Sequence, residues 1–156
     1  DGVAFRPHLV KNIVNLKTGE ERAVAPQPTH RIASTPEHIA IIRNALVGVN
    51  KEGTGARAFA GAEYVSGGKT GTAQVYSLKG GKYEHGKVQE RLRDHALFIA
   101  YAPAEQPTIA LAVLVENGGF GAQSAAPIAR QVLDYWLLGK LPRDAAPEFG
   151  EEVEGD

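Results

Sequence analysis

The chain has 156 residues, of which 17 are Lys or Arg and 18 are Asp or Glu, so its net charge at pH 7 is −1. This size predicts one globular domain or part of one. The near-neutral charge, without a large basic cluster, argues against nucleic acid as a partner. The longest apolar run, 109–115, is far too short to span a bilayer. The chain contains no Cys and no Met, so thiol chemistry is excluded and we expect a piece of a longer protein.

The first part of the chain predicts a β-hairpin over residues 8–25. An apolar-rich run from His8 to Leu16 is followed by a turn at 17–20 and a short return strand at 22–25. Pro26 and Pro28 are expected to end this hairpin because proline cannot donate to a strand ladder.

Two amphipathic helices are predicted, one near the middle of the chain and one near its end. The first begins at Ser34-Thr35-Pro36-Glu37, which supplies a capping hydroxyl, an early proline and an early acid, and it ends at Gly53-Thr54-Gly55. A short helix is expected over 56–60. The last helix places on one face the apolar residues Ile128, Val132, Leu133, Trp136 and Leu137, and we expect Trp136 and Leu137 in the core.

Three strands are predicted between the helices. Residues 68–76 combine glycines with β-branched and aromatic residues, while His95–Tyr101 and Thr108–Val115 are almost continuously apolar, as in strands buried on both faces. Their connections are too short for helical crossovers, so the class is α+β, with an antiparallel sheet and helices packed on its faces. One sheet edge would then lack a partner strand within this sequence.

The most informative motif is Gly68-Lys69-Thr70-Gly71-Thr72. It permits three interpretations: a glycine-bearing strand with an exposed lysine, a phosphate-binding loop, or the Lys-Thr-Gly strand of penicillin-recognising serine acyl-transferases. The phosphate loop is disfavoured because Glu63 stands where its first glycine is required and because a strand, not a helix, follows Thr70.

Longer blocks of sequence favour the third interpretation. The chain resembles the elongation-type class B penicillin-binding proteins, known as penicillin-binding protein 2, over most of residues 1–141. The blocks that carry the resemblance are Gly68–Val75, Asp94–Pro103, Val115–Gly121, Ala125–Arg130 and Asp134-Tyr135. The resemblance implies an incomplete penicillin-binding or serine β-lactamase-like transpeptidase fold, with residues 1–141 as its C-terminal portion and 142–156 as a disordered acidic tail.

The resemblance also implies a function: a D,D-transpeptidase that cross-links peptidoglycan stem peptides through a serine acyl-enzyme. Lys69 and Thr72 would then be catalytic, with Lys69 supplying positive potential and the Thr72 N–H half of an oxyanion hole. Lys69, Thr70, Gly71 and Thr72 would together bind the substrate, with the two hydroxyls directed at its carboxylate. A non-catalytic binding or scaffold domain of the same fold is the alternative.

Two of the family's three catalytic motifs have no match here. The only S-x-x-K sequence is Ser66-Gly-Gly-Lys69, whose glycines cannot reliably form the helical turn that this motif needs. The S-x-N motif is also missing, because no serine in the sequence has an asparagine two residues after it. We therefore read Ser66 as a loop residue. The nucleophile is expected upstream of this chain, and this chain alone is expected to be inactive.

The family implies several partners. These are stem peptides ending in D-Ala-D-Ala, β-lactam antibiotics, the upstream part of the same protein, and a SEDS-type glycosyltransferase with rod-shape scaffold proteins. The location implied is the periplasmic face of the bacterial inner membrane, with the anchor upstream. No cofactor is implied, and the five histidines lack metal-binding spacing. The basic loop 79–93 could form a rim for anionic peptides, although a solvated loop is the simpler interpretation, and His95 is expected to serve a structural hydrogen bond.

Overall fold

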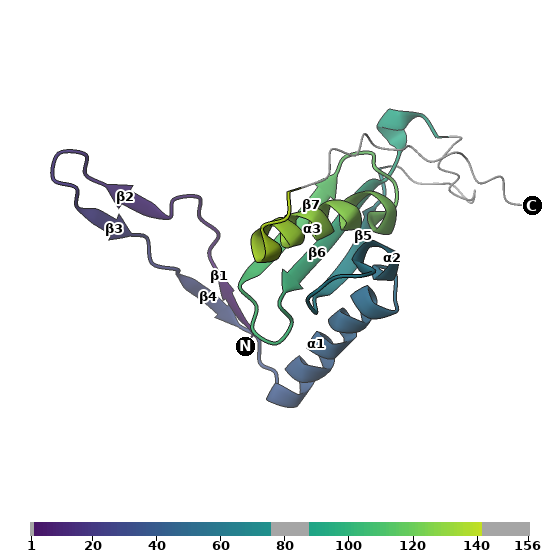
Figure 1. Ribbon diagram of the computed structural model, residues 1–156, viewed down its shortest axis with the longest axis horizontal. Coiled ribbons are helices and arrows are strands. Elements are labelled where there is room, and N and C mark those ends of the chain that lie inside the picture. Colours follow the sequence, from purple (N-terminus) through teal and green to yellow (C-terminus); the bar gives the residue numbers. More distant parts are fainter. Residues whose placement is uncertain (1, 76–87, 142–156) are drawn as a thin grey trace, which may run out of the picture. The chain divides into compact units, whose positions relative to one another are not determined.

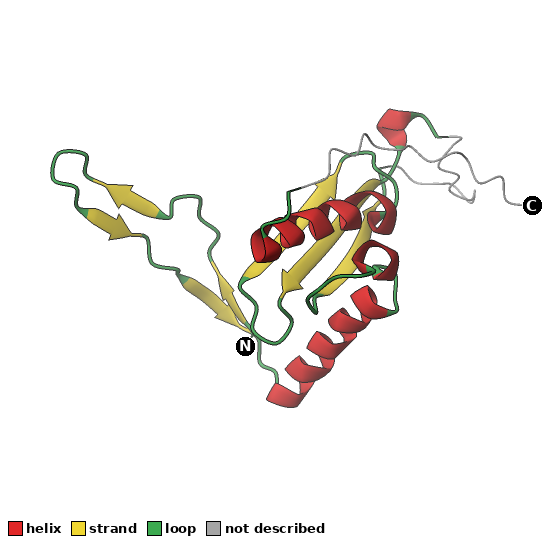
Figure 2. Cartoon of the chain, in the orientation of Figure 1, coloured by secondary structure: helices red, strands yellow, loops and turns green. Residues whose placement is uncertain are grey.

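A computed structural model describes residues 2–75 and 88–141. The chain forms two compact units, residues 1–42 and 43–156, which are described separately. Figure 2 shows the first unit as paired strands and the second as a sheet with helices. The expected tail at 142–156 and most of the basic loop lie outside the described residues. No helix within the described ranges is long and apolar enough to cross a membrane.

The first unit contains four short strands in two antiparallel pairs. Strand β2 (Asn12–Val14) pairs with β3 (Glu21–Ala23), which confirms the hairpin predicted there. The hairpin ends at Ala23, before Pro26 and Pro28, as predicted. Strand β1 (Val3–Phe5) pairs with β4 (Pro28–Arg31), a second pair that the sequence did not predict and that begins at Pro28. A strand in a two-stranded ribbon has one free edge, and proline is tolerated there because no hydrogen bond is lost.

Helix α1 (Pro36–Lys51) has the cap that its sequence predicts. The backbone N–H of His38 donates to the Thr35 hydroxyl at 3.4 Å. The Thr35 hydroxyl also lowers the pKa of the Glu37 carboxyl, which lies in the first turn where the helix dipole favours a negative charge. The short helix α2 (Ala56–Phe59) follows after one turn, as expected.

The second unit is built on a three-stranded antiparallel sheet in the order β5-β6-β7, which confirms the α+β class (Figure 1). Strand β5 (Gly67–Ala73) pairs along its full length with β6 (His95–Ala102), and β6 pairs with β7 (Ile109–Val115). The register places Lys69 opposite Ile99, and Ile99 opposite Ala112. A 3-10 turn, η2 (Glu90–Leu92), precedes β6.

Helix α3 (Gly121–Leu138) packs on one face of this sheet and forms the core with it. The buried core residues are Phe59, Ala96, Phe98, Ala100, Ala102, Ala125, Ala126, Ala129 and Leu133. Small residues on both elements let the helix and the central strand approach closely. The core of this unit is therefore an alanine-rich contact closed by two larger side chains, Phe98 and Leu133, which are both fully buried.

Two expectations about burial were wrong. Strands β6 and β7 are covered on the α3 face only: on the opposite face Ile99 is 52% exposed and Leu114 is 58% exposed. In α3 the residues that meet the sheet are mainly alanines, so Trp136 is 60% exposed, whereas Leu137 does pack against the core. Apolar character alone does not identify the buried face, because close helix packing selects small residues.

The first residue of α3 lies directly on the backbone of β5 and β6. A Cβ atom at Gly121 would stand 2.2 Å from the Leu97 carbonyl oxygen and 2.7 Å from the Gly71 carbonyl oxygen. These neighbours are backbone atoms of paired strands, which cannot move without breaking the ladder. The start of α3 therefore approaches the backbone of β5 and β6 closely, and only glycine fits at position 121.

We predict opposite effects for two glycine-to-alanine substitutions. Gly121→Ala should lower the free energy of unfolding by about 1–3 kcal/mol, because the new methyl group overlaps backbone atoms. Gly48→Ala, in the last turn of α1, should raise it by about 0.5–1 kcal/mol through helix propensity, because the added Cβ atom would lie 3.8 Å from its nearest neighbour, Glu52 Oε1. Urea unfolding followed by circular dichroism measures both. Equal stability of the Gly121 variant and the wild type would contradict the close contact.

Candidate active site

The four residues expected to bind substrate lie together on β5, the strand at one edge of the sheet. Lys69 and Thr72 are exposed, and Thr70 and Gly71 are half-buried. Strand β6 pairs with one side of β5, and no strand in the described part of the chain pairs with the other. The structure therefore presents the Lys-Thr-Gly-Thr sequence along an open strand edge.

We infer from one side-chain contact and from the alternation of strand backbone that the Thr72 N–H lies on this open edge. The Lys69 ammonium donates to the Thr70 carbonyl oxygen at 2.9 Å. In an antiparallel edge strand, residues that bond to the neighbour alternate with residues whose backbone groups point away from it. Because Thr72 is two residues from Thr70, its N–H lies on the same side as the Thr70 carbonyl.

Glycines allow β5 to run between two aromatic rings. A Cβ atom at Gly67 would lie 2.5 Å from the Tyr101 ring, and one at Gly68 would lie 2.7 Å from Phe98 Cζ. The two residues point to opposite faces of the sheet, so each face has its own aromatic neighbour. The strand continues to Ala73, and no helix begins after Thr70, so the phosphate-loop interpretation has no structural basis.

Ser66 is held in the interior rather than presented to solvent. It is 4% exposed, and its hydroxyl accepts a hydrogen bond of 2.9 Å from Asn50 Nδ2. It leads straight into β5 at Gly67, so Ser66 and Lys69 are on extended backbone instead of one helical turn apart. This arrangement supports the interpretation of Ser66 as a loop residue and not as part of an S-x-x-K helical turn.

A third threonine, Thr54, which the sequence analysis treats only as part of a helix end, lies beside the site. The Thr54 and Thr70 hydroxyl oxygens are 3.0 Å apart. Thr54 comes from the turn between α1 and α2, sixteen residues before Thr70. The only local indication of a role for Thr54 was its place between two glycines, Gly53 and Gly55, and nothing in the sequence predicts that this turn contacts β5.

The turn between β7 and α3 is tied to the start of β6. The Asn117 N–H donates to His95 Nδ1 at 2.9 Å, and Asn117 Nδ2 donates to the Arg93 carbonyl at the same distance. Asn117 has a positive φ of 55°, a conformation that asparagine tolerates better than most residues. His95 thus makes a structural hydrogen bond, as expected. Within the described ranges, no group of three His, Asp or Glu residues could hold a metal ion.

A charged network fixes the segment that leads into β5 against α3. The Tyr64 hydroxyl donates to Asp134 Oδ1 at 2.8 Å, and Arg130 Nε contacts the same oxygen at 2.8 Å. The Arg130 guanidinium also lies over the Tyr64 ring and donates to the Ala60 carbonyl. Burial, assisted by the bond to Asp134, raises the pKa of the Tyr64 hydroxyl above its usual value.

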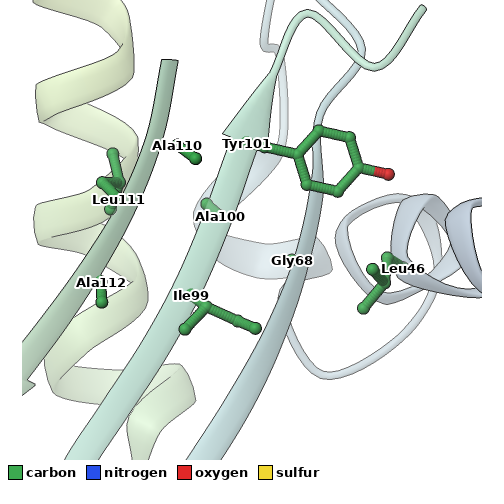
Figure 3. Close-up of a pocket in the computed structure, with 8 residues that line it drawn as sticks. All are labelled: Leu46, Gly68, Ile99, Ala100, Tyr101, Ala110, Leu111 and Ala112. Carbon is green, nitrogen blue, oxygen red and sulfur yellow. The ribbon is translucent and has the colours of Figure 1, made fainter. Parts of the chain in front are cut away.

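An apolar pocket of about 380 Å³ opens on the face of the sheet opposite α3 (Figure 3). Ile99 and Tyr101 extend from β6, and Leu46 faces them from α1. Gly68 of β5 also lines the pocket. This lining lacks charged groups, so it suits an apolar side chain rather than an anionic substrate.

The family's sequence profile, described as the penicillin binding protein transpeptidase domain, matches residues 1–134. The peptidoglycan D,D-transpeptidase MrdA of Haemophilus influenzae is 40% identical over 147 residues, covering 92% of this chain and 22% of that protein. Two solved structures are also similar. Penicillin-binding protein 2 of Pseudomonas aeruginosa, in complex with WCK 5153, is 39% identical with a TM-score of 0.60, covering 79% of this chain and 25% of that one. The imipenem acyl-enzyme of penicillin-binding protein A from M. tuberculosis is 32% identical with a TM-score of 0.63, covering 87% and 27%.

The chain belongs to the penicillin-binding protein transpeptidase family. Within that family it is similar to penicillin-binding protein 2, as the sequence blocks around Lys69, Asp94 and Asn117 predict. The antiparallel sheet with packed helices is the fold of a penicillin-binding transpeptidase domain. This chain spans between 22% and 27% of the length of these three proteins.

The Tyr64 network predicts a loss of stability at alkaline pH. Because the pKa of Tyr64 is raised in the folded state, the unfolded chain ionises first when the pH passes about 10, so the free energy of unfolding falls above that pH and is fully retained below it. Tyr64→Phe should make this decline shallower. Tyr135→Phe, at a side chain that is 55% exposed, should leave it unchanged.

Urea unfolding at several values between pH 8 and pH 11 measures this difference. Identical alkaline slopes for the wild type and Tyr64→Phe would show that Tyr64 titrates equally in the folded and unfolded chains.

Proposed function

We propose that this chain is the C-terminal part of a peptidoglycan D,D-transpeptidase of the cell-elongation type. One observation carries the proposal: the Lys69-Thr70-Gly71-Thr72 sequence lies on an open strand edge in a chain that belongs to the penicillin-binding family. Transpeptidation needs a cation, hydroxyl donors and a backbone N–H at one place, and this edge supplies all three.

Lys69, Thr70 and Thr72 each contribute a chemical group to the proposed reaction. A serine attacks the penultimate D-Ala carbonyl, the terminal D-Ala leaves, and an amine of a neighbouring stem peptide resolves the acyl-enzyme. Lys69 supplies positive potential near that serine, and the Thr70 and Thr72 hydroxyls bind the substrate carboxylate. The Thr72 N–H stabilises the oxyanion, and such a donor contributes about 2.7–4 kcal/mol to transition-state binding.

The serine itself is proposed to come from the upstream part of the same protein. The relatives are several times longer than this chain, and the sheet face opposite α3 exposes Ile99 and Leu114 beside the apolar pocket. Packing an upstream segment on that face would remove this apolar surface from water and bring the serine beside Lys69. The membrane anchor, the periplasmic location and the SEDS-type and rod-shape partners belong to the same proposal.

The alternative is a non-catalytic scaffold of the same fold. It would keep the sheet and the pocket but would have no serine beside Lys69. Covalent labelling separates the two, because only an active serine can open a β-lactam ring.

We predict that a penicillin forms a covalent adduct on the full-length protein and none on this chain alone, as measured by intact mass. Lys69→Ala in the full-length protein should slow acylation by about 10- to 100-fold, which corresponds to the loss of one charge-assisted interaction. Lys140→Ala is the matched control: Lys140 forms a salt bridge with Glu63 and is not on β5, so acylation should change less than about twofold.

Three other outcomes would change the proposal. An adduct on this chain alone would assign the nucleophile to a residue within it, with Ser66 as the first candidate. No adduct on either protein would favour the scaffold. Equal acylation of the wild type and Lys69→Ala would remove Lys69 from the reaction.

A further inference from the structure

The turn between α1 and α2 brings a hydroxyl to the substrate-binding edge. Thr54 Oγ1 lies 3.0 Å from Thr70 Oγ1, and Thr54 is exposed to solvent. The two side chains come from different elements, so their contact depends on tertiary packing. Because Thr70 is proposed to bind the substrate carboxylate, a hydrogen bond between the two hydroxyls would influence the direction in which the Thr70 hydroxyl proton points.

The backbone on both sides of Thr54 is held in place by the end of α1. The Gly53 N–H donates to the Gly48 carbonyl and the Gly55 N–H to the Val49 carbonyl, both at 2.9 Å. A Cβ atom at Gly53 would lie 2.9 Å from Val49 Cα, and one at Gly55 would lie 2.6 Å from Asn50 Oδ1. Thr54 is therefore carried by a tight, hydrogen-bonded turn rather than by a free loop.

A second contact fixes the same turn to β5. Asn50, the next-to-last residue of α1, is 6% exposed and donates to the Ser66 hydroxyl immediately before β5. The two residues contacted, Ser66 and Thr70, are four residues apart in the sequence, and so are their partners Asn50 and Thr54. Two contacts at this spacing set both the position and the rotation of the turn relative to β5.

We propose that Thr54 is a positioning residue that orients the Thr70 hydroxyl toward the substrate carboxylate. A threonine hydroxyl carries one proton and can accept from a neighbour. When Thr54 donates to Thr70 Oγ1, the Thr70 proton is left to point at the substrate. A donor that itself accepts a hydrogen bond is polarised and donates more strongly. This inference rests on the proposed transpeptidase function, because it assigns a role toward that reaction's substrate.

The test is a double-mutant cycle in the full-length protein, with penicillin acylation rates as the readout. Thr54→Val keeps the shape of the side chain and removes the hydroxyl, while Thr54→Ser keeps the hydroxyl. We expect Thr54→Val to slow acylation by about fivefold to tenfold, the effect of one hydrogen bond, and Thr54→Ser to restore it to within about twofold. In a Thr70→Val background, Thr54→Val should have less than about a twofold further effect.

A β-lactam whose carboxylate is esterified separates positioning from structural damage. The decrease in acylation rate caused by Thr54→Val should largely disappear with the ester, because no carboxylate is present to accept the hydrogen bond from the Thr70 hydroxyl. Thr108→Val, an exposed threonine in the turn between β6 and β7, is the matched control and should behave as the wild type with both compounds.

Each remaining outcome overturns the inference in an identifiable way. Equal losses with the acid and the ester would mean that Thr54 only stabilises the turn. A full Thr54→Val effect in the Thr70→Val background would mean that Thr54 acts independently of Thr70. Unchanged acylation by Thr54→Val, with normal acylation by the wild type, would overturn this inference alone, whereas a wild type that is not acylated would overturn the proposed function as well.

Discussion

The second unit depends on the contact between the start of α3 and the paired backbones of β5 and β6. Gly121 has no side chain, so the helix meets the Leu97 and Gly71 carbonyl oxygens directly. This contact sets the height of α3 above the sheet, and the buried alanines of α3 and β6 preserve the same close spacing along the helix. The strand that carries Lys69 is thereby fixed at the level of Gly71, within the motif itself.

The three surfaces of the sheet have different uses. The face toward α3 is a closed, alanine-rich core, and the opposite face is apolar and open around Ile99 and Tyr101. The β5 edge between them carries the polar groups. In the proposed reaction, a serine that the upstream part of the protein places on the open face would reach Lys69 and the Thr72 N–H at this edge without disturbing the core. The division of surfaces therefore suits a site completed by another part of the same protein.

Polar contacts outside the motif position the segments that surround β5. The Tyr64–Asp134–Arg130 network ties the chain before β5 to α3, and the Asn50–Ser66 bond ties it to α1. The His95–Asn117 bond holds the turn that leads into Gly121. These contacts matter for the proposed reaction, because donors aimed at a developing charge act only when they are held in place.

The sequence by itself determined the α+β class, the three antiparallel strands, the Thr35-capped helix and the Lys69–Thr72 motif, because periodicity, capping chemistry and short motifs are local properties. It did not reveal that Pro28 lies in a strand, that β6 and β7 are covered on one face, or that Trp136 is exposed. These depend on which surfaces meet, and a run of apolar residues does not state its partner. Only the tertiary structure placed Thr54 beside Thr70, because that contact joins the turn between α1 and α2 to strand β5, and the separate sequences of these two segments carry no sign of each other.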